Sequence, residues 1–190
     1  ETALDASFNT GSLNHELGLG LRYHNDSIRR FQWHELYHQD ASGNFLSAKR
    51  SANGSDGNRR QETKAMALYA HDELTSGAFK FTPGLRYERL DYSYTDFSTD
   101  GENVPTGSGS SELEVWAAGV GVNYQPSKYW SFFGGFHRGF SVPGPRAHAR
   151  GGIVEETSDA LEAGARFNTG EGFFGELIYF HANLDDLIVV

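Results

Sequence analysis

Cysteine is absent from this chain of 190 residues, proline occurs only five times, and no long stretch is continuously apolar. Without cysteine, neither a disulfide framework nor a thiolate metal site is available. A transmembrane helix needs about 18 or more consecutive apolar residues, and the sequence has no such run. The strands of a transmembrane barrel are not excluded in this way, because only every second side chain of such a strand is apolar.

Positive charge is also scarce. Lys and Arg number 16 against 25 Asp and Glu, and the resulting net charge of −9 argues against a nucleic-acid partner. Glycine is abundant, with 23 residues, and aromatic residues make up 14% of the chain. This composition favours many strands with open turns over a helical bundle, and the length fits one domain or at most two.

The clearest pattern in the sequence has a period of two residues. From Leu13 to His24 the odd positions are mostly leucine, while the even positions are polar or glycine. Such alternation is typical of a strand that separates an apolar from a polar environment. Clear alternation also marks residues 79–88, 112–124 and 160–167, and weaker alternation marks 62–74, 129–140 and 172–184. The sequence therefore predicts an all-β chain of about seven strands.

The connections between these strands alternate in length. Short ones, rich in turn formers, fall at 74–78, 125–128 and 168–172, and long polar ones run through 38–61, 96–111 and 141–156. Tight turns at one end and long loops at the other predict an antiparallel up-and-down meander, the layout of bacterial outer-membrane barrels.

Aromatic residues gather near the ends of the predicted strands. In a membrane barrel such residues form girdles at the two interfaces, although aromatics also favour strands in general. The candidates for a girdle are Tyr23, Tyr87, Tyr92, Tyr124, Tyr129, Trp130 and Phe167.

The stretch HELYH, from His34 to His38, matches the H-E-x-x-H pattern of zinc metalloproteases. That chemistry needs a helix, because only there do the two histidines share one face and one metal. On an extended chain they would lie about 13 Å apart. The surrounding sequence has no helix cap, no amphipathic period and no suitably placed third ligand, so we predict an extended segment without zinc and no catalytic residue.

Several segments resemble the barrel of TonB-dependent outer-membrane receptors, the siderophore and ferric-citrate uptake family. The resemblance rests on segments that occur in the same order as in the family. The second of these segments contains Pro83, which suggests a bulge or kink in that strand. The segments are AMALYAHDEL (65–74), FKFTPGLRYERLDYSY (79–94), FFGGFHRGFSVPGP (132–145), EETSDALEAGARF (155–167) and GELIYFHANLDDLIVV (175–190).

This resemblance implies that residues 1–190 are part of a transmembrane barrel of about twenty-two strands. Nothing in the sequence resembles the plug domain, the short TonB-contacting segment or the terminal strand of the family. Inward positions such as Arg86, Glu88, Glu162 and Arg166 would then face the lumen, where we interpret them as structural charge pairs.

The implied function is import of a ferric-siderophore or ferric-citrate chelate across the outer membrane, with energy from the TonB complex acting through the missing plug, and with no resident cofactor. Many such chelates are anionic, so basic and aromatic loop residues are the candidates for ligand binding. They are Arg29, Arg30, Trp33, His34, Tyr37, His38, Arg146, His148 and Arg150, the last three in a flexible loop.

Two other classes of protein also fit the alternation. A passive porin or a barrel anchor would share the strand pattern, and so would a soluble β-sheet binding module.

Overall fold

The computed structural model describes residues 1–100, 102–170 and 172–188. Eight strands form one antiparallel sheet in the order β1-β2-β5-β6-β7-β8-β9-β10, and a separate hairpin, β3–β4, is inserted between β2 and β5. The elements are β1 (Thr2–Thr10), β2 (Leu13–Gln32), β3 (Glu35–Gln39), β4 (Phe45–Arg50), β5 (Gly57–Ser76), β6 (Phe79–Phe97), β7 (Pro105–Tyr124), β8 (Trp130–Ser141), α1 (Pro145–Gly151), β9 (Glu156–Asn168) and β10 (Phe174–Asp185). No helix in this described part is both long and apolar enough to cross a membrane.

The predicted antiparallel meander is confirmed, with one more strand in its sheet than the sequence indicated. The additional strand is β1, whose polar composition conceals a weak alternation around Leu4, Ala6 and Phe8. The hairpin β3–β4 lies in the predicted long connection 38–61 and the residues before it. Gly101 in the second long connection, Glu171 in a short turn, and Val189 and Val190 at the end of the last family-like segment lie outside the described residues.

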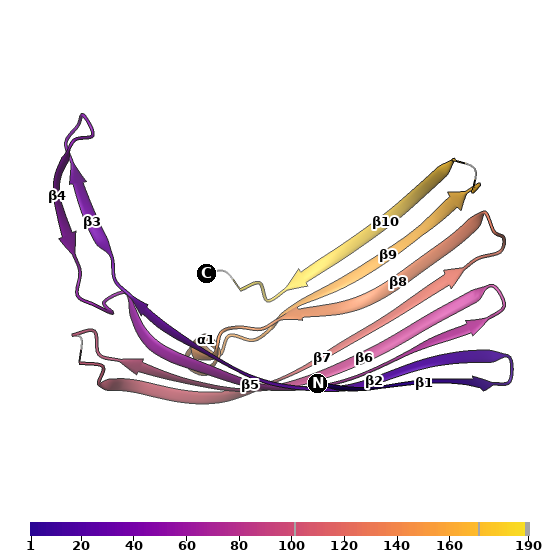
Figure 1. Ribbon diagram of the computed structural model, residues 1–190, viewed down its shortest axis with the longest axis horizontal. Helices are drawn as coiled ribbons and strands as arrows, with labels where there is room; N and C mark the ends of the chain where they lie inside the picture. The colour runs from indigo at the N-terminus through magenta and orange to yellow at the C-terminus, as the bar shows by residue number, and fades with distance from the viewer. Residues whose placement is uncertain (101, 171, 189–190) are drawn as a thin grey trace.

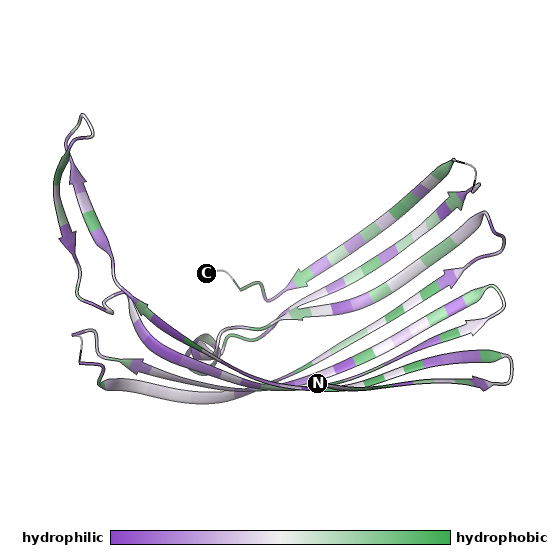
Figure 2. Cartoon of the chain, in the orientation of Figure 1, coloured by the Kyte–Doolittle hydropathy of each residue, from purple (hydrophilic) through white to green (hydrophobic). Residues whose placement is uncertain are grey.

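The sheet is strongly curved, with short turns at one end and long connections at the other (Figure 1). Helix α1 lies on the concave side, where His148 contacts Ser111 and Tyr92. Because side chains alternate along a strand, Tyr87 and Trp116, which have the opposite phase, face the convex side. Hydropathy alternates residue by residue along the half of the sheet nearest the short turns (Figure 2).

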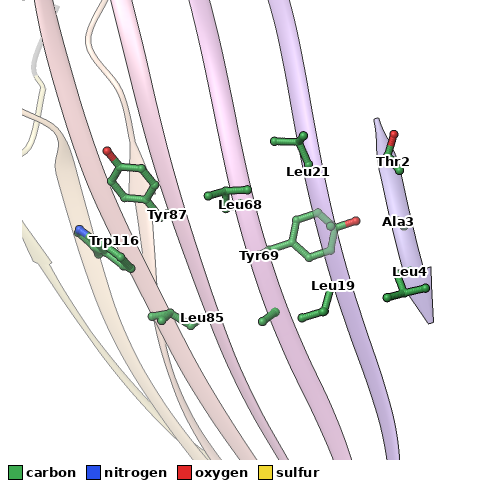
Figure 3. A pocket seen from close by; sticks show the side chains of 12 residues that line it. Thr2, Ala3, Leu4, Leu19, Leu21, Leu68, Tyr69, Leu85, Tyr87 and Trp116 are labelled. Atoms are coloured by element: carbon green, nitrogen blue, oxygen red, sulfur yellow. The ribbon is translucent and has the colours of Figure 1, made fainter. Parts of the chain in front are cut away.

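The convex face of this half is apolar across neighbouring strands, apart from the paired His15 and Asp72. The register places Leu21 opposite Leu68, Leu68 opposite Tyr87, and Tyr87 opposite Trp116. These side chains line a shallow apolar groove together with Leu19 and Leu85 (Figure 3). Such a surface suits hydrocarbon chains rather than water.

Two aromatic belts border this apolar face. Near the short turns, Phe79 stacks on Tyr124 with ring centroids 4.4 Å apart, and Trp130 lies 4.7 Å from Phe167. Further along the strands, Tyr87 lies 4.7 Å from Trp116. Eight residues separate Phe79 from Tyr87, which is about 26 Å along the strand and about 20 Å in height at a typical tilt. The belts are therefore spaced like the girdles of a transmembrane barrel.

Tyr92 does not belong to either belt, so that part of the girdle prediction is wrong. Its side chain has the phase of Leu90 and faces the concave side, where it is only 3% exposed. It belongs to a small core beneath the 141–156 connection, with Phe140 and Val142 packed against it. The buried core residues are Ala65, Leu90, Tyr92, Leu113 and Val115.

Pro83 does not cause the bulge that the sequence suggested. The β5–β6 pairing is interrupted between His71–Gly84 and Leu74–Phe81, yet the register is the same on both sides of the gap. The interruption lies on the side of β6 that pairs with β5, and Pro83 has no N–H to donate there. On the side that pairs with β7, Pro83 remains opposite Val120.

Aromatic rings lie flat over glycines on the concave wall. A Cβ placed on Gly20 would come within 2.0 Å of Tyr69 Cζ, and one placed on Gly164 within 2.5 Å of Phe133 Cζ. The glycines at these positions therefore let neighbouring rings cover the backbone and keep the wall smooth.

Valine at Gly20 is expected to destabilise the protein by about 1–3 kcal/mol, because the new side chain collides with the Tyr69 ring. Gly121 has the same inward phase but nothing within 4 Å of an added Cβ, so Gly121→Val serves as the control. Urea unfolding midpoints compare the two variants. The double variant Gly20→Val/Tyr69→Ala is expected to recover part of the loss, and equal midpoints for Gly20→Val and Gly121→Val would contradict this explanation.

Candidate functional site

The HELYH segment is extended, as predicted. Glu35 to Gln39 form β3, and His34 precedes the strand with its Nδ1 2.7 Å from Asp56 Oδ1. The hydroxyl of Tyr37 donates a hydrogen bond to the carboxylate of Glu35 at 2.7 Å. The glutamate of the motif therefore bonds to a side chain of the same strand. Across the described residues, no group of three or more His, Cys, Asp or Glu is placed to hold a metal ion.

The predicted ligand residues form two groups along the sequence, residues 29–38 and residues 146–150. The structure divides the first group between two places. Trp33 and His34 lie at the base of the β3–β4 hairpin, and Tyr37 and His38 lie on it, exposed to solvent. The hairpin projects beyond the long-loop end of the sheet (Figure 1). Arg29 donates to Asn103 at 2.9 Å and lies over the ring of Phe97, on the face opposite Arg30.

The second group lies on a helix instead of in a flexible loop. Residues 145–151 form α1, which begins with Pro145 and is followed by Gly152 in the left-handed region at φ 61°. Proline in the first turn and glycine after the last are both favourable there, and alanine and arginine between them favour a helix. Arg146, His148 and Arg150 are therefore held in fixed positions on the concave wall.

Polar contacts attach α1 to three strands. The Arg146 side chain donates from Nε to both carboxylate oxygens of Asp96 at 3.0 Å, and its backbone N–H donates to Gln61 at 3.1 Å. His148 Nδ1 lies 2.7 Å from the hydroxyl oxygen of Ser111. Arg150 adds a weaker contact of 3.4 Å to Asp96, so one carboxylate serves two arginines.

A polar hollow of about 440 Å³ opens beside this attachment. Its lining includes Asn58, Arg59, Asp96, Thr99, Thr106 and Arg146. In the register, Arg30 lies opposite Arg59 and Arg59 opposite Asp96. The register thus places Arg30, from the first predicted group, in the same row as Asp96, the carboxylate that Arg146 and Arg150 from the second group contact.

Arg59 contributes an unsatisfied charged donor to this hollow. Its Nε is buried and has no hydrogen-bond partner within the described part of the chain. Partial burial lowers the pKa of Arg59, and repulsion from Arg146 and Arg30 lowers it further, whereas Asp96 acts in the opposite direction. The hollow is lined by Asp56 and Asp96 as well as by Arg59 and Arg146, and the buried Nε of Arg59 remains in it as a charged donor without an acceptor in the described chain.

Sequence reasoning missed Arg59 and Asp96. The alternation that identifies β5 and β6 near the short turns becomes irregular toward the long loops. At that end the predicted strands stopped at residue 62 in β5 and at residue 88 in β6. Extending the same inward phase from Tyr69 and Arg86 would have placed both residues on the concave wall.

The inward charges nearer the short turns are mostly paired, which supports their structural interpretation. Arg86 Nε donates to Glu88 at 2.6 Å, and Arg166 Nε donates to Glu176 on β10 at 2.5 Å. Lys80 lies 2.5 Å from Glu73 across the β5–β6 pair.

The long-loop half of β6 also carries a buried phenol. Burial raises the pKa of Tyr92 to about 12, and Glu88 and Glu155 contribute in the same direction. An acid whose pKa is raised by folding stabilises the fold below its ordinary pKa, near 10, and that stabilisation is lost between about pH 10 and pH 12. We expect Tyr92→Phe to lose less stability than the unmodified protein over this range, as measured by denaturation at stepped pH. Identical slopes for the two proteins would contradict the burial of this phenol.

Comparison with known proteins defines what this curved sheet is. The family model described as TonB dependent receptor-like, beta-barrel, matches residues 1–190. The chain belongs to the TonB-dependent receptor β-barrel family. The predicted resemblance is thereby confirmed, and so is the meander as part of such a barrel.

Solved structures of one transporter and two receptors have the same fold. The ferric citrate transporter FecA in its unliganded form matches 96% of this chain with a TM-score of 0.73 and 21% identity. The siderophore receptor PiuA from Acinetobacter baumannii matches 94% with a TM-score of 0.69 and 14% identity. The ferric-catecholate import receptor Fiu from E. coli K12, in its closed form, matches 96% with a TM-score of 0.62 and 16% identity. This chain spans 26%, 30% and 30% of those three proteins, respectively.

Proposed function

We propose that the chain is a section of the barrel wall of a larger outer-membrane receptor that imports a ferric chelate of the siderophore or ferric-citrate type. Family membership supports this proposal, and the structural neighbours include a ferric citrate transporter and receptors for siderophores and ferric catecholates. Eight strands compare with about twenty-two in receptors of this kind, so further strands and a plug domain would complete the protein.

The proposed location in the outer membrane follows from the apolar convex face. A transmembrane barrel needs an outward apolar band about 25 Å tall with aromatic residues at both borders. The belts at Phe79–Tyr124 and Tyr87–Trp116 supply these borders. Lipid is therefore the proposed partner of the convex face, and the plug that of the concave face near the short turns.

The arginine-lined hollow above the membrane band is the observation that best supports anionic cargo. Arg59 and Arg146 line it, Arg30 lies opposite Arg59, and Arg150 contacts Asp96, all at the long-loop end, which is the outer end of a barrel in this orientation. The wall carries no chemistry of its own in this proposal. The protein is a transporter whose energy is supplied by the TonB complex through the plug.

Uptake of radioactive iron tests the function. The full-length protein, expressed in bacteria that lack their own ferric-chelate receptors, is expected to import ferric citrate or a ferric siderophore only when TonB is present. Uptake that persists without TonB, together with swelling of liposomes that contain the purified protein, would contradict the proposal and favour a passive porin. A protein that remains soluble without detergent would favour a binding module.

A further inference from the structure

The hollow beside α1 is lined by two arginines, Arg59 and Arg146, and of these only Arg59 has a buried donor without a partner in the described chain. Arg146 shares the carboxylate of Asp96 with the neighbouring Arg150. Arg30, opposite Arg59 in the register, donates to the neutral amide oxygen of Gln32. Asp56 also lines the hollow, and its carboxylate lies 2.7 Å from His34 Nδ1. Arg59 stands between Arg30 and Asp96 in the register and keeps a buried N–H without a partner in the described chain.

A buried donor without an acceptor is costly, and this one is charged. The adjoining hollow of about 440 Å³ has room for a small anion and presents hydroxyls of Thr99 and Thr106 besides the arginines. An oxygen anion placed there would satisfy Arg59 and reduce its repulsion with Arg146.

Asp96 indicates which oxyanion fits. Its two carboxylate oxygens each lie 3.0 Å from Arg146 Nε, so the cluster already accommodates a planar carboxylate. The side chain is itself only 19% exposed, which places this carboxylate within the hollow and not in bulk water. The carboxylate of Asp96 therefore already neutralises part of the positive charge of Arg146.

We infer that the hollow is a carboxylate-binding site centred on Arg59 and Arg146, and that Asp96 competes with the incoming carboxylate for the same arginines. This inference rests on the proposed function, in which the carboxylate belongs to the cargo or its chelator. This competition lowers the affinity of the hollow for a ligand with one carboxylate, because Asp96 already binds the arginine. A ligand with several carboxylates makes more contacts and is therefore favoured.

Calorimetric titration of citrate into the full-length receptor in detergent, without iron, tests the site directly. Arg59→Gln is expected to weaken citrate binding by about 10- to 100-fold, because it removes a charge-assisted hydrogen bond. The matched control is Arg60→Gln. Arg60 is the next residue along β5, has the opposite phase and pairs with Glu62 at 2.7 Å, so its loss is expected to change the affinity by less than about twofold.

Asp96→Asn provides the decisive second variant, because a misfolded protein cannot bind more tightly. Removing the competing carboxylate is expected to tighten citrate binding by roughly threefold or more at low salt, and the gain should shrink as salt is added. Inorganic phosphate is expected to bind more weakly than citrate to all these proteins.

The results separate failure of this inference from failure of the proposed function. Absence of citrate binding, equal losses for the Arg59 and Arg60 variants, unchanged or weaker binding to Asp96→Asn, or tighter binding of phosphate than of citrate would each overturn the carboxylate site. TonB-dependent uptake of a ferric chelate would remain intact in that case. Loss of uptake with Arg59-dependent citrate binding retained would instead overturn the proposed transport.

Discussion

Arginine in place of Ala118 is expected to destabilise the protein in a bilayer by about 1–3 kcal/mol, and arginine in place of Ala117 is expected to cost clearly less. Ala118 lies opposite Leu85 on the convex face, where a charge would enter hydrocarbon. Ala117 lies opposite Arg86 on the concave face, next to the Arg86–Glu88 pair and the wet lumen. The two residues are identical and adjacent, so strand propensity and depth are closely matched.

Urea titration of the full-length receptor in lipid vesicles measures the difference. Gel mobility with and without heating reports how much barrel has formed in each variant. Equal stability of the two variants would show that both faces meet the same environment, and the membrane orientation described here would then be wrong.

Replacing Asp72 with leucine is expected to cost about 3 kcal/mol or more, because it leaves His15 without its partner in a lipid-facing position. His15 Nδ1 lies 2.7 Å from Asp72 Oδ2, and both side chains have the outward phase of Leu17 and Leu19. Phe8 stacks on the His15 ring with centroids 4.5 Å apart and shields the pair. The pair therefore lies in the apolar band but is covered by the chain itself.

The double variant His15→Leu/Asp72→Leu is expected to regain most of this loss, because it removes both polar groups together. Asp26→Leu is the control, since Asp26 lies 3.2 Å from His24 in a solvent-exposed His–Asp pair and its loss should cost less than about 1 kcal/mol. The free energy of unfolding in vesicles is measured for the unmodified protein, Asp72→Leu, the double variant and Asp26→Leu. A double variant as unstable as Asp72→Leu, or equal losses from the two aspartates, would contradict a shielded pair.

The part of the fold that lies between the aromatic belts could be predicted from the sequence because two environments act on it there. Lipid requires an apolar side chain at Leu85 and Tyr87, and the lumen permits Arg86 and Glu88, so the period of two is visible. Beyond the belts both faces of β2, β5 and β6 meet water or other protein, and the alternation fades. This is why the upper strand extensions and the inward orientation of Tyr92 were not anticipated.

The candidate site was only half accessible to sequence reasoning for a related reason. Basic residues in loops, such as Arg146 and Arg150, stand out in a sequence, but their partner Asp96 comes from a strand about fifty residues away along the chain. Register, which determines that Arg30, Arg59 and Asp96 share one row, depends on pairing between strands and cannot be read from any one of them. The role of the nine predicted ligand residues stays a prediction.

In the proposed function, barrel structure and cargo binding occupy different halves of this wall. The half near the short turns combines an apolar exterior with a smooth, charge-paired interior, which suits a wall between lipid and a plug. The half near the long loops carries the arginine cluster, α1 and the projecting hairpin, which suits recognition of a solute outside the membrane.

Accessibility scanning across residues 79–88 tests the alternation of the two faces most directly. The 190 residues contain no cysteine, so single cysteines introduced there provide the only nitroxide attachment sites within this section of the wall. In the full-length receptor in vesicles, labels at 79, 81, 85 and 87 are expected to be accessible to oxygen dissolved in lipid, and labels at 80, 82, 84, 86 and 88 to a water-soluble relaxation agent. A profile without this two-residue period would contradict the assignment of lipid to the convex face.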